Sequence, residues 1–134
     1  MKDKKIIVSG KRKTSVARAT ITEGKGKISI NNTISEKLPL LRKLMIEEPI
    51  RIAANHGDIN FDIKVDIKGG GSESQIEAAR LAIARAILAF TKSEVIKRDF
   101  LNYDRNMLIA DTRKKETCKP GDSKARAMRQ SSKR

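Results

Sequence analysis

The sequence predicts an α+β fold in two layers, in which helices cover one face of a small mixed sheet and an extended basic tail follows. Three observations predict it. Apolar and polar residues alternate through INFDIKVDI (59–67), as in a strand with one buried and one solvated face. An apolar stripe at helical spacing follows in residues 72–90, and all periodicity stops after residues 106–111. The length of 134 residues suits one domain with a single modest core.

The first half of the chain predicts three strands and a short helix. The strands are residues 4–8 (KKIIV), 15–21 (SVARATI) and 27–30 (KISI), with a turn at EGKG (23–26). Asn31 and Asn32 tolerate left-handed backbone, so a further turn is expected there. Residues 35–48 carry leucines and a methionine at three- and four-residue spacing. They predict a helix that Pro39 breaks and that ends before Pro49.

The second half predicts a long helix and a short one. Ser72 with Gln75, or Ser74 with Glu77, fits a capping box at the start of the long helix. Its main apolar stripe runs from Ile76 to Phe90, while Leu81 and Leu88 lie on roughly the opposite side, so we expect it to pack on two surfaces. Ser93 predicts the cap of a second short helix. The predicted order is β-β-β-α-β-α-α followed by the tail, which favours helices on one face of the sheet.

Positive charge is concentrated at the two ends of the chain. Residues 1–27 and residues 113–134 each carry nine Lys or Arg and two acids, whereas residues 28–112 carry twelve of each sign. This distribution predicts a domain over residues 1–112 with a basic N-terminal arm, and a basic tail over residues 113–134 that is disordered when free. We expect residues 28–112 to fold without either arm. Basic arms on a neutral body are typical of a polyanion ligand, although a solvated charge run is the alternative.

Composition narrows the kind of ligand. The only aromatic residues are three Phe and one Tyr, so base stacking is disfavoured and phosphate contact is the expected source of affinity. No apolar run is long enough to cross a bilayer. Cys118 is the only cysteine and His56 the only histidine, with His56 in a predicted turn. Neither has the neighbours that a metal site or a catalytic nucleophile needs, so we predict no metal and no cofactor.

Two glycine-containing segments are candidates for phosphate contact. KGGGSES (68–74) lies between a strand and a helix, where it is either a structural turn that needs positive φ, a cradle for a backbone phosphate, or both. It matches neither nucleotide-binding glycine motif, so an enzymatic role is the weakest interpretation. GKRKTSVAR (10–18) places Lys11, Arg12 and Lys13 at the entry to a strand and Arg18 further along it. These four cations suit a phosphate groove.

Several blocks of the sequence together resemble one known family. The blocks are, in order, GKRKTSVARA, GKGKISINN, KGGGSESQIEAARLAIARAIL, FLNYDRNMLIADTRKKE, KPG and the ending KAR…SKR. They resemble small-subunit ribosomal protein nine over nearly the whole chain, and YDRNMLIADTR resembles its archaeal and eukaryotic branch. The resemblance implies a fold related to the second domain of ribosomal protein five, with an uncommon left-handed crossover.

The resemblance also implies a non-enzymatic role in the cytoplasmic ribosome. Its partners would be ribosomal RNA in the head of the small subunit, neighbouring head proteins, and transfer RNA in the peptidyl site. The tRNA-facing residues would be Lys133 and Arg134. The rRNA-facing residues would be Lys11, Arg12, Lys13, Arg18, Lys68, Gly69, Gly70, Gly71, Arg113, Lys114, Lys115, Lys119, Lys124, Arg126 and Arg129.

The chain departs from the family pattern at two positions. Ser74 stands where many relatives have glycine, which questions a need for positive φ there. Lys133 stands where the archaeal branch often has tyrosine, which questions a terminal stacking contact.

Two other classes of protein share some of these features. A DNA-compacting protein would share the charge, but its recognition helix would carry clustered bases, whereas the long helix here has only Arg80 and Arg85. A small-molecule kinase would share the glycine turn, but it would need acidic metal ligands that the sequence does not group together.

Overall fold

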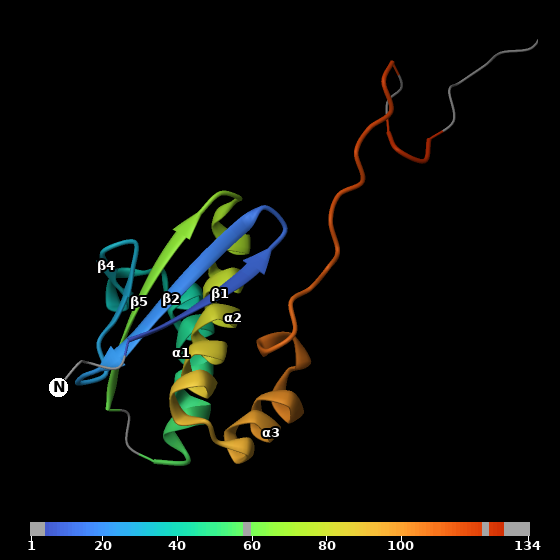
Figure 1. Ribbon diagram of the computed structural model, residues 1–134. Helices are drawn as coiled ribbons and strands as arrows, with labels where there is room; N and C mark the ends of the chain where they lie inside the picture. Colours follow the sequence, from blue (N-terminus) through green and yellow to red (C-terminus); the bar gives the residue numbers. More distant parts are fainter. Residues whose placement is uncertain (1–4, 58–59, 122–123, 128–134) are drawn as a thin grey trace, which may run out of the picture.

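The protein is a two-layer α+β domain with a long C-terminal extension, as the sequence predicts (Figure 1). The computed structural model describes residues 5–57, 60–121 and 124–127. The strands are β1 Ile6–Arg12, β2 Ser15–Glu23, β3 Ile28–Ile30, β4 Thr33–Ile34 and β5 Phe61–Lys68. The helices are α1 Leu40–Ala54, α2 Ser72–Thr91 and α3 Glu94–Tyr103, with 3-10 turns η1 Ser35–Lys37 and η2 Arg105–Met107. The helices lie on one face of the sheet, and the other face is open to solvent.

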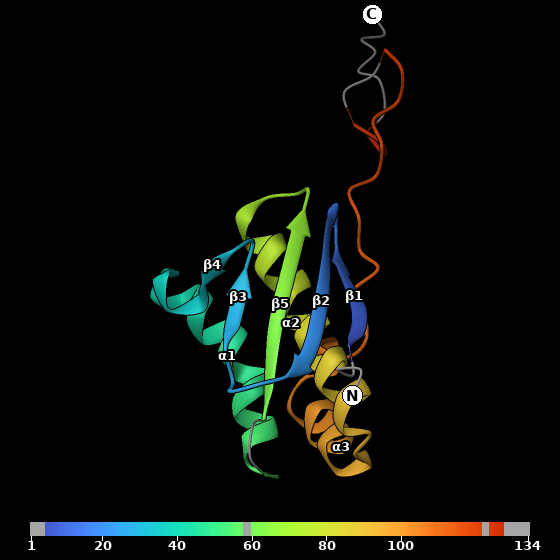
Figure 2. The same cartoon turned by 60° about the vertical axis from the view of Figure 1, so that its left-hand side comes forward.

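The five strands form one mixed sheet in the order β1-β2-β5-β3-β4. All neighbours are antiparallel except β3 and β5, which are parallel. In Figure 2 both of these strands run upward, α1 crosses behind the sheet between them, and β5 lies to the right of β3. The crossover is therefore left-handed, as the family resemblance implies.

The basic N-terminal segment, which the charge distribution predicts to be an arm of the domain, forms two strands of the sheet. Residues 6–12 and 15–23 are β1 and β2, and β2 lies between β1 and the central strand β5, with which it pairs over eight residues. Ala17, Ala19 and Ile21 of β2 are fully buried. Arg18 alternates with these apolar residues along β2, so this strand presents a cation on its open face and apolar residues to the core.

The first helix differs most from its prediction. Pro39 is the residue before α1 and does not break it, and α1 continues through Pro49 to Ala54. Proline inside a helix removes one backbone hydrogen bond. Pro49 is fully buried, and its neighbours on the same face, Ile46 and Ala53, are buried too. Packing of this face therefore offsets the lost hydrogen bond, which no local rule predicts.

The long helix α2 lies at the centre of the core. Its alanines Ala78, Ala79, Ala82 and Ala86 are fully buried, and they allow the helix to approach the sheet closely. Leu81, on the other side, is also buried, which confirms that α2 packs on two surfaces. Neither predicted capping box forms, because Gly71 occupies the cap position without a side-chain bond. Ser74 is inside the helix and does not have positive φ.

The remaining elements follow their predictions closely. Ser93 caps α3 by accepting a hydrogen bond from the backbone of Ile96. Asn31 and Asn32 have positive φ and form the turn between β3 and β4, a short strand that the sequence did not indicate. The predicted strand over 59–67 is β5, although Ile59 lies outside the described residues. None of the described helices has the length and apolar character needed to span a membrane.

Candidate nucleic-acid interface

Two basic segments that are far apart in the sequence meet at one end of the sheet. The β1–β2 hairpin turns at Lys13 and Thr14, and the glycine turn after β5 lies beside it. A Cβ atom on Gly69 would be 2.8 Å from the Thr14 carbonyl oxygen, which shows how close the two turns are. Strand register places Lys11 and Lys68 on either side of Val16 on the open face. This end therefore gathers the side chains of Lys11, Lys13 and Lys68, which are all exposed.

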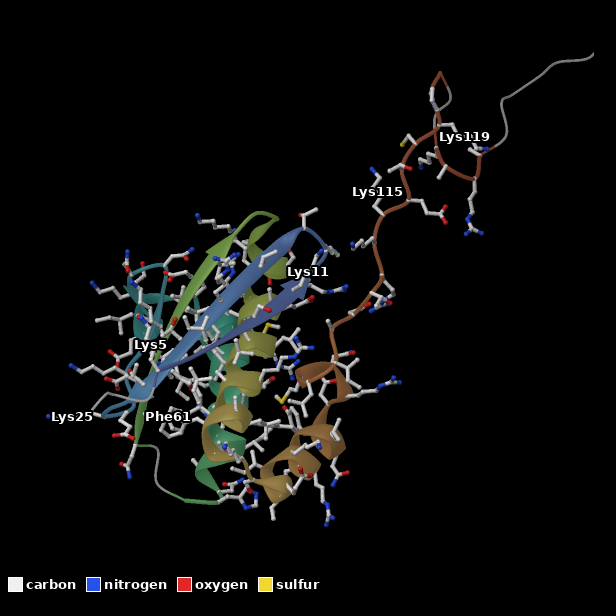
Figure 3. The ribbon with its side chains drawn as sticks, in the orientation of Figure 1. Lys5, Lys11, Lys25, Phe61, Lys115 and Lys119 are labelled. Atoms are coloured by element: carbon white, nitrogen blue, oxygen red, sulfur yellow. The ribbon has the colours of Figure 1, made fainter. Side chains whose placement is uncertain are left out.

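The beginning of the tail passes the same end of the sheet. A hollow of about 310 Å³ is lined by Lys11 and Lys13 of the hairpin and by residues 110–112 and Lys114. Figure 3 shows Lys11 at this end, with the chain continuing past it toward Lys115 and Lys119. We name Lys11, Lys13, Lys68 and Lys114 the basic edge. Four ammonium groups at one end of the sheet suit an anionic backbone, and the Asp111 carboxylate that lines the same hollow is paired with Arg12 and Arg113.

The glycine turn is built as a structural turn. Gly69 and Gly70 have φ of +77° and +71°, the left-handed region that glycine adopts most readily. The buried Ser15 hydroxyl donates to the Gly69 carbonyl at 2.9 Å, and Gln75 donates to the same oxygen at 3.1 Å. Ser74 donates to the Gly71 carbonyl at 2.9 Å. The structural interpretation of KGGGSES is therefore confirmed, whereas a phosphate at this turn stays a prediction.

The open face of the sheet carries further cations along its length. Arg18 is exposed on β2, where it lies opposite Asp66 of β5. Lys64 is exposed one row further on, opposite Thr20, and the sequence analysis did not assign it to the site. The alternation of residues 59–67 was sufficient to place Lys64 on the solvated face together with Lys68.

Arg12 stands apart from its neighbours because its guanidinium is already neutralised within the protein. Its side chain is only 16% exposed. Its Nε donates to the Glu77 carboxylate of α2, and its Nη1 forms an ion pair with Asp111 Oδ2 at 3.1 Å. Arg113 binds the same carboxylate, with Nη2 at 2.6 Å from Oδ2 and its backbone N–H at 2.9 Å from Oδ1. These bonds from Arg113, with the charge of Arg12 beside them, hold the pKa of Asp111 well below its usual range. Asp111 is therefore ionised at neutral pH.

The tail residues of the predicted site are solvent-facing where the structure describes them. Lys114, Lys115, Lys119 and Lys124 are exposed. Arg126 donates to Glu116 at 2.7 Å, and this ion pair raises the pKa of Arg126 and lowers that of Glu116. Arg129, Lys133 and Arg134 lie outside the described residues.

The aromatic rings are arranged for packing rather than for stacking on bases. Phe61 and Phe100 are buried, and Phe61 meets Phe90 edge to face at 5.8 Å between ring centroids. Tyr103 is 59% exposed, but it lies at the end of α3 and not on the open face of the sheet. Affinity for a nucleic acid through this surface would therefore come from charge and hydrogen bonds to the backbone.

Comparison with known proteins identifies the family. The family model for ribosomal protein S9/S16 matches residues 10–134. The chain belongs to this family. It is 46% identical over 128 residues to small ribosomal subunit protein uS9 of Methanococcus vannielii, covering 92% of this chain and 93% of the relative. It is 44% identical to the uS9 proteins of Methanococcus maripaludis C7, over 126 residues, and of Methanothrix thermoacetophila, over 125 residues. These two alignments cover 92% of this chain, and 93% and 94% of the respective relatives.

Membership of the S9/S16 family confirms the resemblance noted in the sequence, including its archaeal character. Members of this family have a structural role in the ribosome and are not enzymes. The kinase and DNA-compaction alternatives are therefore set aside. Among the described residues, no three His, Cys, Asp or Glu side chains are grouped so that they could hold a metal ion.

Proposed function

We propose that this protein is a structural constituent of the small ribosomal subunit that binds ribosomal RNA in the subunit head. The observation that carries the proposal is the meeting of the β1–β2 hairpin, the glycine turn and the start of the tail at one end of the sheet. Ribosomal RNA is the polyanion that this surface suits, because the lysines of the basic edge face solvent and the aromatic rings do not form a platform. The mechanism is positioning and neutralisation of phosphate charge.

The rRNA-binding residues of the proposal divide into two groups. The basic edge, Arg18 and the Gly69–Gly71 turn form a fixed surface on the domain. The second group lies in the tail and would contact the RNA beyond the body of the protein. It consists of Arg113, Lys115, Lys119, Lys124, Arg126 and Arg129. Because the tail has too few apolar residues to build a core, its order would come from the RNA that it contacts.

Removal of charge from the basic edge is expected to weaken rRNA binding. The double variant Lys11→Gln/Lys114→Gln should bind a head fragment of small-subunit rRNA on the order of tenfold more weakly at low salt, since two exposed phosphate contacts together contribute about 1–2 kcal/mol. The measurement is a filter-binding titration at several salt concentrations. The matched control is Lys97→Gln/Arg98→Gln, which removes the same charge from the exposed surface of α3. An equal loss of rRNA affinity in the two variants would show that only net charge matters and that the basic edge is not an RNA-binding site.

The tail is further proposed to reach tRNA in the peptidyl site through Lys133 and Arg134. Deletion of residues 131–134 should leave thermal stability and subunit assembly unchanged. Ribosomes with the truncated protein should hold peptidyl-site tRNA more weakly, by about 1–3 kcal/mol for two charge-assisted contacts. The loss should shrink as salt rises, because it reflects counterion release. Equal tRNA affinity at low salt with and without the four residues would contradict the tRNA contact.

A further inference from the structure

Three arginines of the body hold the segment that leads from α3 into the tail. Arg80 of α2 donates to Asp104 at 2.8 Å, at the end of α3. Arg85, also on α2, donates to the Leu108 carbonyl at 2.9 Å and to the Ser9 carbonyl of β1 at 3.1 Å. Arg12 of β1 is the third, through its ion pair with Asp111. The three contacts fall at regular intervals along residues 104–111, beside the buried side chain of Met107.

The contacts are hydrogen bonds at Asp104 and Leu108 and an ion pair at Asp111. The side chains of Arg12, Arg80 and Asp111 are 16%, 15% and 14% exposed, so their charges are largely removed from water and need their partners. Each arginine also binds an element of the body: Arg12 binds Glu77, Arg80 binds Glu48 of α1 at 2.6 Å, and Arg85 binds β1. The segment is thereby tied to β1, α1 and α2 together. A planar guanidinium that binds two partners fixes their relative position better than a single contact does.

The last of these contacts determines where the tail begins. Asp111 is held by Arg12 on one side and binds both the side chain and the backbone N–H of Arg113 on the other. Arg113 is 81% exposed, so it is the first cation of the tail that faces solvent. Beyond it, the bonds described for residues 114–121 and 124–127 are those between Glu116 and Arg126, within the tail itself.

We propose that Arg12, Arg80 and Arg85 form an arginine clamp that sets the direction in which the tail leaves the body. Arg12 is a positioning residue in this arrangement and not a phosphate ligand, which revises the role expected from its place in GKRK. The consequence for RNA binding rests on the proposed function. When the first residues of the tail are held in place, the tail samples a smaller volume than when they are free to move. Its cations are therefore present near the RNA at a higher effective concentration.

The direction of the tail can be measured in the free protein. Cys118 is the only cysteine and is exposed, so a spin label on it, paired with a second label at Lys97→Cys on α3, reports the distance between tail and body. Asp111→Asn and Arg85→Gln should each broaden the distance distribution at least twofold, because they release the clamp at two separate points. Arg98→Gln, an exposed arginine of α3, is the control and should leave the distribution unchanged. Unchanged distributions in variants that are folded by circular dichroism would overturn the clamp.

RNA affinity gives a second test, because the clamp and simple electrostatics predict opposite changes in affinity for the same variant. Asp111→Asn removes a negative charge beside the basic edge, so simple electrostatics predicts tighter binding to a head fragment of rRNA. The clamp predicts weaker binding, by about threefold or more. Tighter binding together with a broadened distance distribution would show that the arginine clamp orders the tail but does not increase RNA affinity. If the unaltered protein does not bind the fragment, the proposed function fails, while the distance measurement still tests the clamp.

Discussion

A chain that begins at residue 28 is expected to lose its cooperative thermal transition. The truncation removes β1 and β2, and β2 is the strand between β1 and β5. Ile63 and Val65 of β5 are fully buried in the complete sheet and would become exposed, as would the alanine face of α2. Burial of one such aliphatic side chain is worth about 1.5–3 kcal/mol, and a domain of this size is stable by only about 5–15 kcal/mol. Exposure of these two side chains together with the alanine face of α2 is therefore comparable with the whole available stability.

Amide exchange tests this result directly. In the full chain we expect slow exchange for the β5 and α2 amides, and in residues 28–134 we expect none to be protected. The matched control is a chain that begins at residue 5, which keeps every described strand and should unfold at the same temperature as the full protein. Protected β5 amides in the shorter fragment would show that residues 28–112 form an independent domain after all.

Replacement of Gly10 by alanine is expected to cost about 3 kcal/mol of unfolding free energy. A Cβ atom at this position would be 2.4 Å from the Ala78 carbonyl oxygen and 2.7 Å from the Ala82 nitrogen. Both are backbone atoms of α2, so neither can rotate away, and the helix must move from the sheet. That movement would also strain the hydrogen bond from Arg85 to the Ser9 carbonyl. The effect is measured as a shift in the urea midpoint at constant slope.

Gly71 provides the control for this substitution. It has ordinary extended backbone with φ of −89°, and a Cβ atom there would meet nothing within 4 Å. Gly71→Ser also places a good cap residue before α2, so stability should change by less than about 0.5 kcal/mol. If Gly10→Ala cost no more than Gly71→Ser, the close packing of β1 on α2 would not be required for stability.

The sequence by itself determined the periodic and charged features of the protein. The alternation in residues 59–67 fixed the buried face of β5, and the two-sided apolar pattern of α2 placed it in the core. Ser93 was identified as a cap because its hydroxyl acts on an amide only three residues away. The exposed cations Lys11, Lys13, Arg18 and Lys68 were found for the same reason: strand periodicity and charge are local properties.

Only the tertiary structure decided which charges are available to a ligand. Lys11, Arg12 and Lys13 are neighbours with similar charge, but Arg12 is neutralised by Glu77 and Asp111, which lie 65 and 99 positions further along the chain. No local pattern reports contacts over such separations. The same is true of Pro49, whose place inside a helix depends on packing of the buried α1 face. It is true also of the basic N-terminal segment, because net charge cannot show that β2 pairs with both β1 and β5 in a sheet whose opposite face is apolar.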